Sequence, residues 1–302
     1  MTRFSSICNQ KKAAMLKSLC LSVILLLIGL TMIFPAVFTL ADSFMDSWEI
    51  SEYYGTGAEK PEAPDSAERY MAFRLIPYEA TLKQYKSVLI DRPQYLFMFW
   101  NSIKLTLPIA IGQLVVAAMA AYAFMLLKSK PAGVIFFLYI ITMLLPFQVT
   151  LVPNYIIAQK LGIMGSALSI ILPGIFGTFG VFLLRQYTVS IPLSYIEAAK
   201  IDGAGHLHIF LKIVIPLLKP GLAALFILLF MDNWNMVEQP LIFLSDPLEE
   251  PLSVFLSNIN KEEPGIAFAA AFVYMLPAIL VFLYGEEYLV TGMGIQLAGI
   301  KG

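Results

Sequence analysis

Two histidines form the most recognisable spacing of chemically active side chains in this sequence. His206 and His208 make a His-x-His pair, and imidazole nitrogens are common metal ligands. Residues two apart on a helix point in different directions, and no third ligand type lies near this pair. We therefore do not expect a metal site. The same shortage of histidines and clustered carboxylates argues against a membrane enzyme.

A phosphate-binding loop would mark a chain that uses ATP itself. The pattern Gly-x-x-x-x-Gly-Lys-[Ser/Thr], whose backbone N–H groups cradle phosphates, does not occur in the sequence. The loop glycines Gly55 and Gly57 lack the lysine and the preceding strand. We expect no cofactor and no ATPase site in this chain.

Ionisable residues avoid the middle of every long apolar stretch. A charged side chain at the centre of a bilayer costs about 2.5–3.5 kcal/mol or more, so one found there is a candidate functional group. Lys104, Arg185, Asp232, Glu286 and Glu287 all lie near the ends of apolar stretches. Because a proton or sodium relay needs a buried acid, this placement disfavours an ion-coupled secondary transporter.

The elements that must position these residues are membrane helices. Of 302 residues, 59% are hydrophobic and 14% are charged, whereas soluble domains are about 45–50% apolar and about 25% charged. The net charge of −1 gives no reason to expect nucleic acid as a partner. The predicted fold class is therefore all-α, a polytopic membrane protein in contact with lipid.

Six apolar runs are long enough to cross a hydrocarbon layer of roughly 30 Å. They cover about 19–41, 102–127, 132–157, 167–187, 213–231 and 266–285. A cleaved signal peptide is an alternative for the first run, but its apolar part exceeds the roughly 7–15 residues of such peptides. We expect a retained anchor. Gly174, Gly177 and Gly180 in the fourth run predict close approach of another helix.

Basic residues orient these spans. They gather before the first span, between the second and third, and between the fourth and fifth, and include Lys11, Lys12, Lys17, Lys128, Lys130, Lys200, Lys212 and Lys219. The positive-inside rule assigns these segments to the cytoplasm. Both termini are then expected to be cytoplasmic.

This topology divides the chain into four parts. Residues 1–41 form a cytoplasmic tail and the first span, and 42–97 an extracytoplasmic loop. Residues 98–290 form a five-helix core, and 291–302 a cytoplasmic tail. We expect the polar first half of the external loop to be a flexible surface segment, and its part from Tyr78 to Arg92 to hold a short helix.

A cytoplasmic loop at about 190–220, within the core, carries the strongest pattern. Pro192 suits the start of a helix. The apolar surface of this helix would come from Tyr195, Ile196, Ala199 and Ile201. Gly203 and Gly205 then predict a sharp turn, since glycine adopts backbone angles that other residues avoid.

A second short helix is expected from Leu207 to about Ile215, with a break near Pro216 and Pro220. The predicted product is a helix-turn-helix that displays Glu197, Lys200 and Asp202. From these features alone, two interpretations are equal alternatives: a surface loop whose residues simply favour a turn, and a segment that binds another protein.

Seven residues of this loop resemble the EAA motif of binding-protein-dependent ABC importer permeases. That motif reads Glu-Ala-Ala-x3-Gly-x9-Ile-x-Leu-Pro, and the matching residues are Glu197, Ala198, Ala199, Gly203, Ile213, Ile215 and Pro216. Only Ile215 departs from the pattern, with isoleucine in place of leucine. The resemblance extends from about Tyr85 to the C-terminus.

Shorter segments are similar to the sugar permeases of the maltose-type group. They are Asp202-Gly203-Ala204, Asn101-Ser102, Ala120-Ala121-Tyr122-Ala123, Trp234-Asn235 near Pro240-Leu241, and Gly299-Ile300-Lys301-Gly302. The resemblance therefore implies a permease for a sugar or oligosaccharide, in a bacterial or archaeal cytoplasmic membrane. Other cargoes of the same family, namely polyamines, amino acids, phosphate or peptides, are the alternative.

The resemblance also implies partners and residue roles. Residues Glu197 to Gly203 would be a coupling helix seated on a separate ATPase subunit, which binds ATP and Mg. Glu197 would pair with a basic group there, Ala198 and Ala199 would permit close approach, and Gly203 would make the bend. A second, different permease subunit and an extracytoplasmic solute-binding protein would complete the importer.

Five polar or aromatic residues are candidates for the substrate path. They are Gln148, Asn154, Asn233, Trp234 and Asn235. For Gln148 and Asn154, hydrogen bonding between helices is an equal alternative. For Trp234 we favour an anchor at the membrane interface over a stacking face for a sugar ring.

Overall fold

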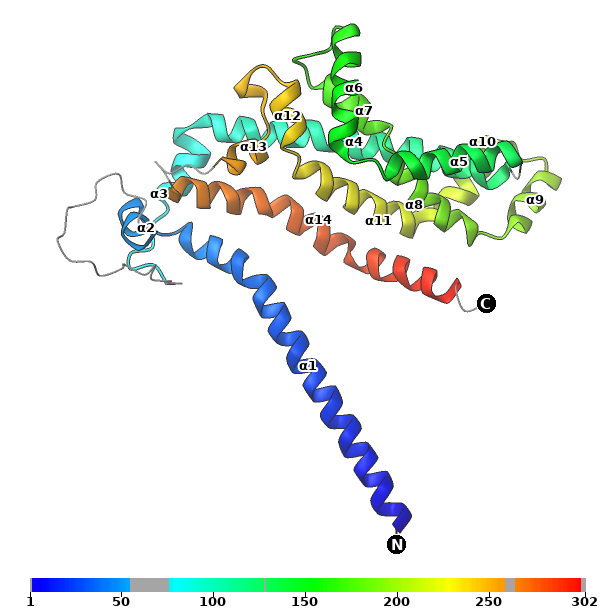
Figure 1. The fold of residues 1–302 in the computed structure, drawn as a ribbon, viewed down its shortest axis with the longest axis horizontal. Coiled ribbons are helices and arrows are strands. Elements are labelled where there is room, and N and C mark those ends of the chain that lie inside the picture. The colour runs from blue at the N-terminus through cyan, green and yellow to red at the C-terminus, as the bar shows by residue number, and fades with distance from the viewer. Residues whose placement is uncertain (1, 55–75, 128, 259–263, 300–302) are drawn as a thin grey trace. The chain divides into compact units, whose positions relative to one another are not determined.

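The structure is a computed structural model that describes residues 2–54, 76–127, 129–258 and 264–299 (Figure 1). Over these ranges the chain is helical, without a β-strand. The α-helices are α1 (Thr2–Asp42), α2 (Ser47–Tyr54), α3 (Lys83–Lys86), α4 (Pro93–Leu126), α5 (Lys130–Met143), α6 (Phe147–Lys160), α7 (Leu168–Ile175), α8 (Thr178–Val189), α9 (Leu193–Ile201), α10 (His206–Ile209), α11 (Ile215–Trp234), α12 (Glu238–Phe243), α13 (Leu252–Ser257) and α14 (Pro264–Gly299). The π-helical turns η1 (Ser87–Asp91) and η2 (Phe210–Val214) and the 3-10 turn η3 (Pro247–Glu249) complete the order.

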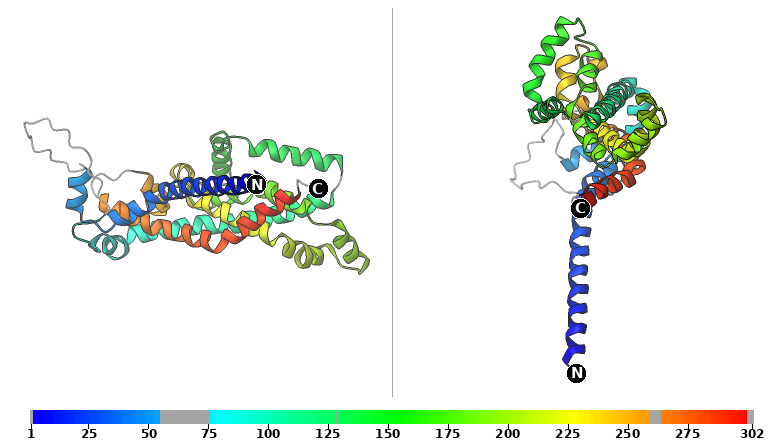
Figure 2. Two further views of the ribbon diagram at one scale, coloured as in Figure 1. Left: turned by 90° about the horizontal axis from the view of Figure 1, so that it is seen from below. Right: turned by 90° about the vertical axis from the view of Figure 1, so that its right-hand side faces the viewer.

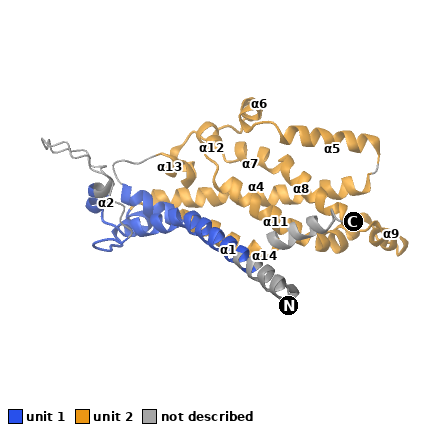
Figure 3. Cartoon of the chain, turned by 60° about the horizontal axis from the view of Figure 1, so that its bottom comes forward, with its two compact units in different colours: residues 1–91, 259–273 blue, residues 92–258, 274–302 orange. Residues whose placement is uncertain are grey.

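The chain divides into two compact units (Figure 3). The first unit comprises residues 1–91 and 259–273, and the second comprises 92–258 and 274–302. The second unit contains the loop with the EAA-like residues and the clusters of buried hydrophobic side chains, so the functional argument rests on it.

In the first unit, α1 contains a membrane-length apolar segment, Lys17–Asp42. No residue of its most apolar window is buried. A helix that is apolar on all sides needs an apolar solvent or another protein around it. The prediction of a helical first span is confirmed.

Polar contacts hold the segment that follows α1. Lys83 Nζ lies 2.8 Å from Asp46 Oδ2, and this bond lowers the pKa of the Asp46 carboxyl and raises the pKa of the Lys83 amine. The Thr81 N–H donates to the Phe44 carbonyl (2.8 Å). The short helix predicted here is present as α3 and η1. The first half of the predicted external loop, residues 55–75, lies outside the described part of the chain.

The second unit is built around α4, which packs against α7, α8 and α11. Small side chains line the contact: Ala110, Ala117, Ala118 and Ala121 of α4 are buried with Val181 and Leu184 of α8 and Leu225 and Leu229 of α11. Between membrane helices, small residues let backbones approach closely and so increase van der Waals contact. The Ala120–Ala123 segment thus lies partly in this contact.

The glycines of the fourth predicted span are confirmed as points of close approach. A Cβ added at Gly174 would lie 2.8 Å from the Ile109 side chain, and one at Gly180 would lie 3.0 Å from Ala117. A Cβ at Gly177 would collide with the Gln113 amide. All three neighbours belong to α4, so these glycines set the distance between α4 and the α7–α8 pair.

The third of the six predicted spans is not one straight helix. Five helices of the described chain are long and apolar enough to cross a membrane, and a sixth crossing requires α5 and α6 together. These two helices meet at 102° across a break at residues 144–146 (Figure 2). Pro146 disfavours helical backbone at the residue before it and supplies no N–H, which explains the break.

The fourth span is interrupted as well, between α7 and α8. Phe176 ends α7, and Gly177 has extended backbone angles (φ −58°, ψ 140°) before α8 begins. Pro173 within α7 removes one backbone donor just ahead of this break.

A glycine outside these breaks tests the tightness of the core. In Gly221→Ala the new Cβ would lie 2.7 Å from the buried Tyr187 ring, so we expect a loss of stability of about 1–3 kcal/mol. Gly133→Ala is the control, since no atom lies within 4 Å of the added Cβ. Thermal unfolding of both purified variants in detergent measures the difference. Equal melting temperatures would contradict the packing described.

Candidate functional site

The predicted coupling segment forms a helix, α9, that directly follows Pro192 as expected. The expected apolar surface is divided between two sides. Ile196 is 2% exposed and faces the protein, whereas Tyr195 is 55% and Ile201 is 86% exposed. Tyr195 and Ile201 are therefore not covered by any part of the described chain.

The EAA-like residues lie on and around this helix. Glu197, Ala198 and Asp202 are exposed, and Ala199 is half-buried. Glu197 makes no ion pair with any described residue, so its carboxylate is open to a partner. Pro216 is exposed and Ile213 half-buried further along the chain.

The turn after α9 is a Schellman motif, and its hydrogen bonds explain the residue types. The Gly203 N–H donates to the Lys200 carbonyl (3.0 Å), and the Ala204 N–H donates to the Ala199 carbonyl (2.9 Å). Gly203 has φ +81°, which L-residues with a Cβ rarely adopt. Ala199 and Ala204 pack in one apolar cluster, as this motif favours.

The second glycine of the turn does not behave as predicted. Gly205 has φ −72° and ψ 159°, an extended conformation open to any residue. It precedes the first residue of α10 and needs no special backbone freedom.

The expected break after the second short helix is also wrong. From His206 to Trp234 the chain forms one helical segment of 29 residues. The π-helical turn η2 ends at Val214, two residues before Pro216, which occupies a first-turn position of α11. In a π-helical turn the backbone bonds run from residue i to residue i+5, and a proline in the first turn of α11 has no N–H that the helix requires. The helix therefore continues past Pro216.

Buried side chains fasten α9 and this long helix to the membrane helices. Ile196 of α9 packs in one cluster with Tyr122 of α4, Tyr187 of α8 and Ile209, Val214 and Leu218 of the long helix. Tyr122 Oη and His206 Nδ1 are 3.2 Å apart and share a hydrogen bond. His208 does not join this pair but lies with Asp202 at an open groove of about 560 Å³. The loop is therefore rigidly connected to the spans.

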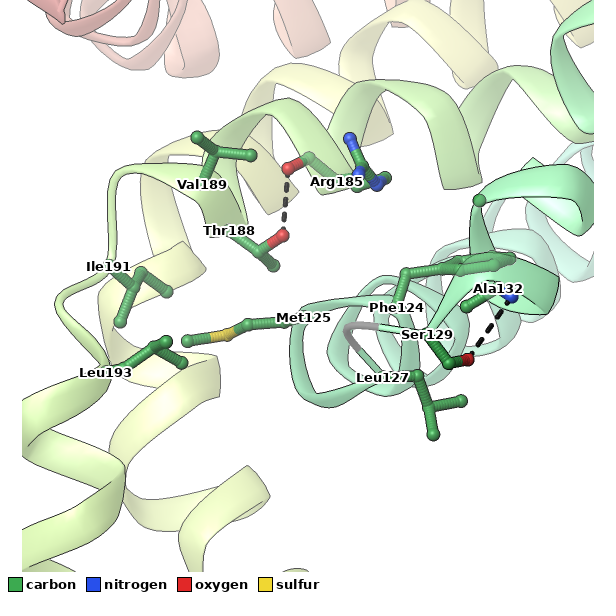
Figure 4. A pocket seen from close by; sticks show the side chains of 11 residues that line it. Phe124, Met125, Leu127, Ser129, Ala132, Arg185, Thr188, Val189, Ile191 and Leu193 are labelled. Carbon is green, nitrogen blue, oxygen red and sulfur yellow. Dashed lines mark hydrogen bonds between the residues drawn. The ribbon is translucent and has the colours of Figure 1, made fainter. Parts of the chain in front are cut away.

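A pocket of about 400 Å³ lies beside this connection, where the α4–α5 turn meets the start of α9 (Figure 4). Arg185 of α8 places its guanidinium 4.0 Å from the centre of the Phe136 ring. The Thr188 hydroxyl donates to the Arg185 carbonyl (2.8 Å), and Ser129 caps α5 by accepting from the Ala132 N–H. Arg185 thus keeps its charge at the helix end, stacked on an aromatic ring.

Toward the other end of α11, the two broken spans border an open cavity of about 820 Å³. Its polar lining consists of Gln113, Thr142, Thr150, Asn154, Thr178, Asp232, Asn233 and Gln239. Residues of both breaks line it, among them Leu145 and Phe147 of the first and Phe176 and Gly177 of the second. A neighbouring cavity of about 730 Å³ shares Asp232, Asn233 and Gln239 and adds Asn235 and Glu238.

The five predicted path residues are only partly brought together. Asn154 and Asn233 line the larger cavity and Asn235 the neighbouring one. The Gln148 amide donates to Glu238 (3.2 Å). The structure brings these four residues to one region of the second unit.

Trp234 is placed differently. It is 1% exposed, stacks on Phe230 and Tyr274, and donates its indole N–H to the Tyr274 carbonyl (3.1 Å). Neither ring face is open, so the interpretation as an interfacial anchor is wrong. A substrate would find no free stacking face there either.

Sequence reasoning missed Gln113, which lies in the middle of α4 and lines the larger cavity. A single amide within an otherwise apolar span was the available signal. It also missed the role of Asn101 and Ser102. The Asn101 amide donates to the Leu248 carbonyl (2.7 Å), and the Ser102 hydroxyl accepts from the Leu252 N–H (3.0 Å).

The turn after α9 can be tested with its own two glycines. Gly203→Ala is expected to strain the turn by about 1–2 kcal/mol, because alanine disfavours the positive φ. Amide hydrogen exchange of Ala204 should then be about 5- to 30-fold faster. Gly205→Ala is the control, as no atom lies within 4 Å of either added Cβ. Unchanged exchange in Gly203→Ala would refute the capping role.

Comparison with known proteins agrees with this architecture. The family described as binding-protein-dependent transport system inner membrane component matches residues 113–293. The arabinooligosaccharides transport system permease protein of Bacillus subtilis is 31% identical over 216 residues, which cover 69% of this chain and 74% of that protein. The lactose transport system permease protein of Rhizobium radiobacter is 30% identical over 65% of this chain and 73% of its own length.

A solved structure has the same fold. A chain of a bacterial ABC transporter involved in the import of the acidic polysaccharide alginate superposes with a TM-score of 0.74 at 22% identity. The match covers 90% of this chain and 95% of that chain. The family match, the relatives and the membrane helices lead to one conclusion: the chain belongs to the binding-protein-dependent transport system inner membrane components, and is a multi-pass membrane transport subunit.

Proposed function

We propose that this chain is the translocating half of an ATP-driven importer for a carbohydrate. The observation that carries the proposal is the rigid link between the exposed α9 and the fifth span. An ATPase subunit that binds ATP and Mg would seat α9, a second permease would complete the path, and an extracytoplasmic binding protein would deliver the substrate.

The geometry explains how a movement at α9 reaches the cavity. From His206 to Trp234 the helix is about 43 Å long at 1.5 Å per residue. Its first turn bonds to Tyr122 beside α9, and its last turns supply Asp232 and Asn233 to the cavity. A rigid displacement of α9 is therefore transmitted along one continuous helix, as in other domain motions that act through packed elements.

Several exposed residues of α9 and its turn would contact the ATPase subunit. Glu197 offers a carboxylate to a basic group of the ATPase, and Ala198 lets the partner backbone approach. Tyr195 and Ile201 add apolar contact area on the exposed side. Gly203 fixes the direction in which α9 projects.

The orientation follows from the basic residues. If α5 and α6 together make one crossing, the chain crosses six times, and both termini share the cytoplasmic side with α9. We place the protein in a bacterial or archaeal cytoplasmic membrane on the basis of the family.

Two lines of support favour a carbohydrate as substrate. The relatives are named for arabinooligosaccharides and lactose. The cavity in this chain is lined by amides, threonine hydroxyls and one carboxylate, which can pair with several sugar hydroxyls at once. A non-sugar solute carried by the same machinery is the alternative.

The driving force can be tested by reconstitution. In proteoliposomes with its ATPase, partner permease and binding protein, we expect uptake of the sugar retained by the binding protein to require ATP and to persist without an ion gradient. Alone, this chain should hydrolyse no ATP. Uptake that stops when a protonophore is added at constant ATP would instead favour an ion-coupled transporter.

Orientation and docking can be tested together by cysteine labelling, after replacement of Cys8 and Cys20. Ala198→Cys should react with a membrane-impermeant maleimide only in inside-out vesicles, and the bound ATPase should slow the reaction at least tenfold. Glu249→Cys, which is exposed on η3, is the control and should react only in right-side-out vesicles, with or without the ATPase. Reaction of both positions from one side would refute the topology.

A further inference from the structure

The larger cavity owes its existence to the two broken spans. Residues at both breaks, 144–146 and 176–177, line the cavity, so helices that continued through these residues would change its walls. Its volume of about 820 Å³ lies within the range of ligand sites, roughly 300–1,000 Å³. Irregular backbone at membrane depth is tolerated where it lines a water-filled space.

Gln113 is a polar side chain of α4 that lines this cavity. It is 4% exposed, and no hydrogen bond joins its amide to any described residue. It lies about 30 Å from the start and about 20 Å from the end of α4 at 1.5 Å per residue, and so near the centre of the bilayer. Its amide opens onto the cavity, so water or a ligand there can satisfy its hydrogen-bonding groups.

Gly177 lies against the Gln113 amide. A Cβ at position 177 would collide with the Gln113 amide, so the glycine leaves room for that amide beside the break. The helix that begins there, α8, has no side-chain cap, nor does α6 at the other break. Uncapped first turns offer backbone N–H groups to an acceptor.

The charges around the cavity select among ligands. No Lys, Arg or His is among the residues that line either cavity, and Asp232 borders both. Two helix N-termini contribute roughly half a positive charge each, which Asp232 offsets, and Glu238 adds a negative charge nearby. A phosphate or carboxylate would therefore find donors but no cation to pair with.

We propose that this cavity is a hydrated binding site for an uncharged, hydroxyl-bearing part of the substrate, and that Gln113 hydrogen-bonds it at the bilayer centre. The proposal rests on the proposed function and narrows its substrate to neutral sugars. A substrate such as an acidic polysaccharide would be disfavoured by Asp232.

Thiol labelling of the complete importer in detergent tests this without knowledge of the sugar. With Cys8 and Cys20 replaced, Gln113→Cys and Asn154→Cys should react with the cationic reagent MTSET and the anionic reagent MTSES. Ala118→Cys is the control: it lies on the same helix, 2% exposed within the packed cluster, and should react at least tenfold more slowly. Asn154→Cys keeps the test valid if the change at 113 impairs folding.

Each rate is divided by the rate of the same reagent with free cysteine. At Gln113→Cys and Asn154→Cys we expect MTSET to be favoured about 3- to 10-fold, and Asp232→Asn to reduce that preference. If neither cysteine reacts, the proposal that the cavity is hydrated is wrong. If MTSES reacts as fast as MTSET or faster, the proposal that the cavity disfavours anions is wrong. Both measurements are labelling rates and do not depend on uptake. The proposed importer function is tested separately, by ATP-dependent uptake in proteoliposomes.

Discussion

The close packing of α4 against α7, α8 and α11 is the constraint on which the second unit depends. Alanines of α4 and glycines of α7 and α8 bring the helices so near that a single added Cβ at Gly174 meets a neighbouring side chain at 2.8 Å. Between helices in lipid, association depends on van der Waals contact and hydrogen bonds rather than on burial from water. The contact therefore has to be tight, and it fixes the position of the α9 loop relative to the cavity.

The loop after the fourth span combines a tight turn with a firm attachment. The Schellman motif at Gly203 fixes the angle between α9 and α10, while Ile196 buries the inner face of α9 among Tyr122, Tyr187 and Ile209. The exposed side of α9 carries polar and charged residues beside two large apolar side chains, Tyr195 and Ile201. A partner that binds this surface can shift the long helix as a unit, because η2 carries the helix past Pro216 without a break.

The helix breaks contribute directly to the walls of the larger cavity. Pro146 and Gly177 interrupt two spans, and residues beside both breaks line the same cavity as Gln113. The breaks expose backbone donors, and the polar side chains come from α4, α5, α6, α8, α11 and α12. Six elements contribute, so a change in the position of any one of them alters the cavity.

The sequence by itself determined the membrane class, the positions of most spans, the start of α9 and the need for glycine at residue 203. These features are local: apolar length, a proline before a helix and a positive φ are all readable from neighbouring residues. The seven EAA-like residues lie within one loop, so they could be found as well.

Only the tertiary structure decided the features that depend on distant residues. Trp234 looked like a membrane anchor until the packing of Phe230 and Tyr274 covered both of its faces. Gln113 looked like an ordinary position in an apolar helix until two breaks opened a cavity beside it. Burial and cavities are made by contacts between segments far apart in the chain, and residue types along one segment do not reveal which neighbours will meet there.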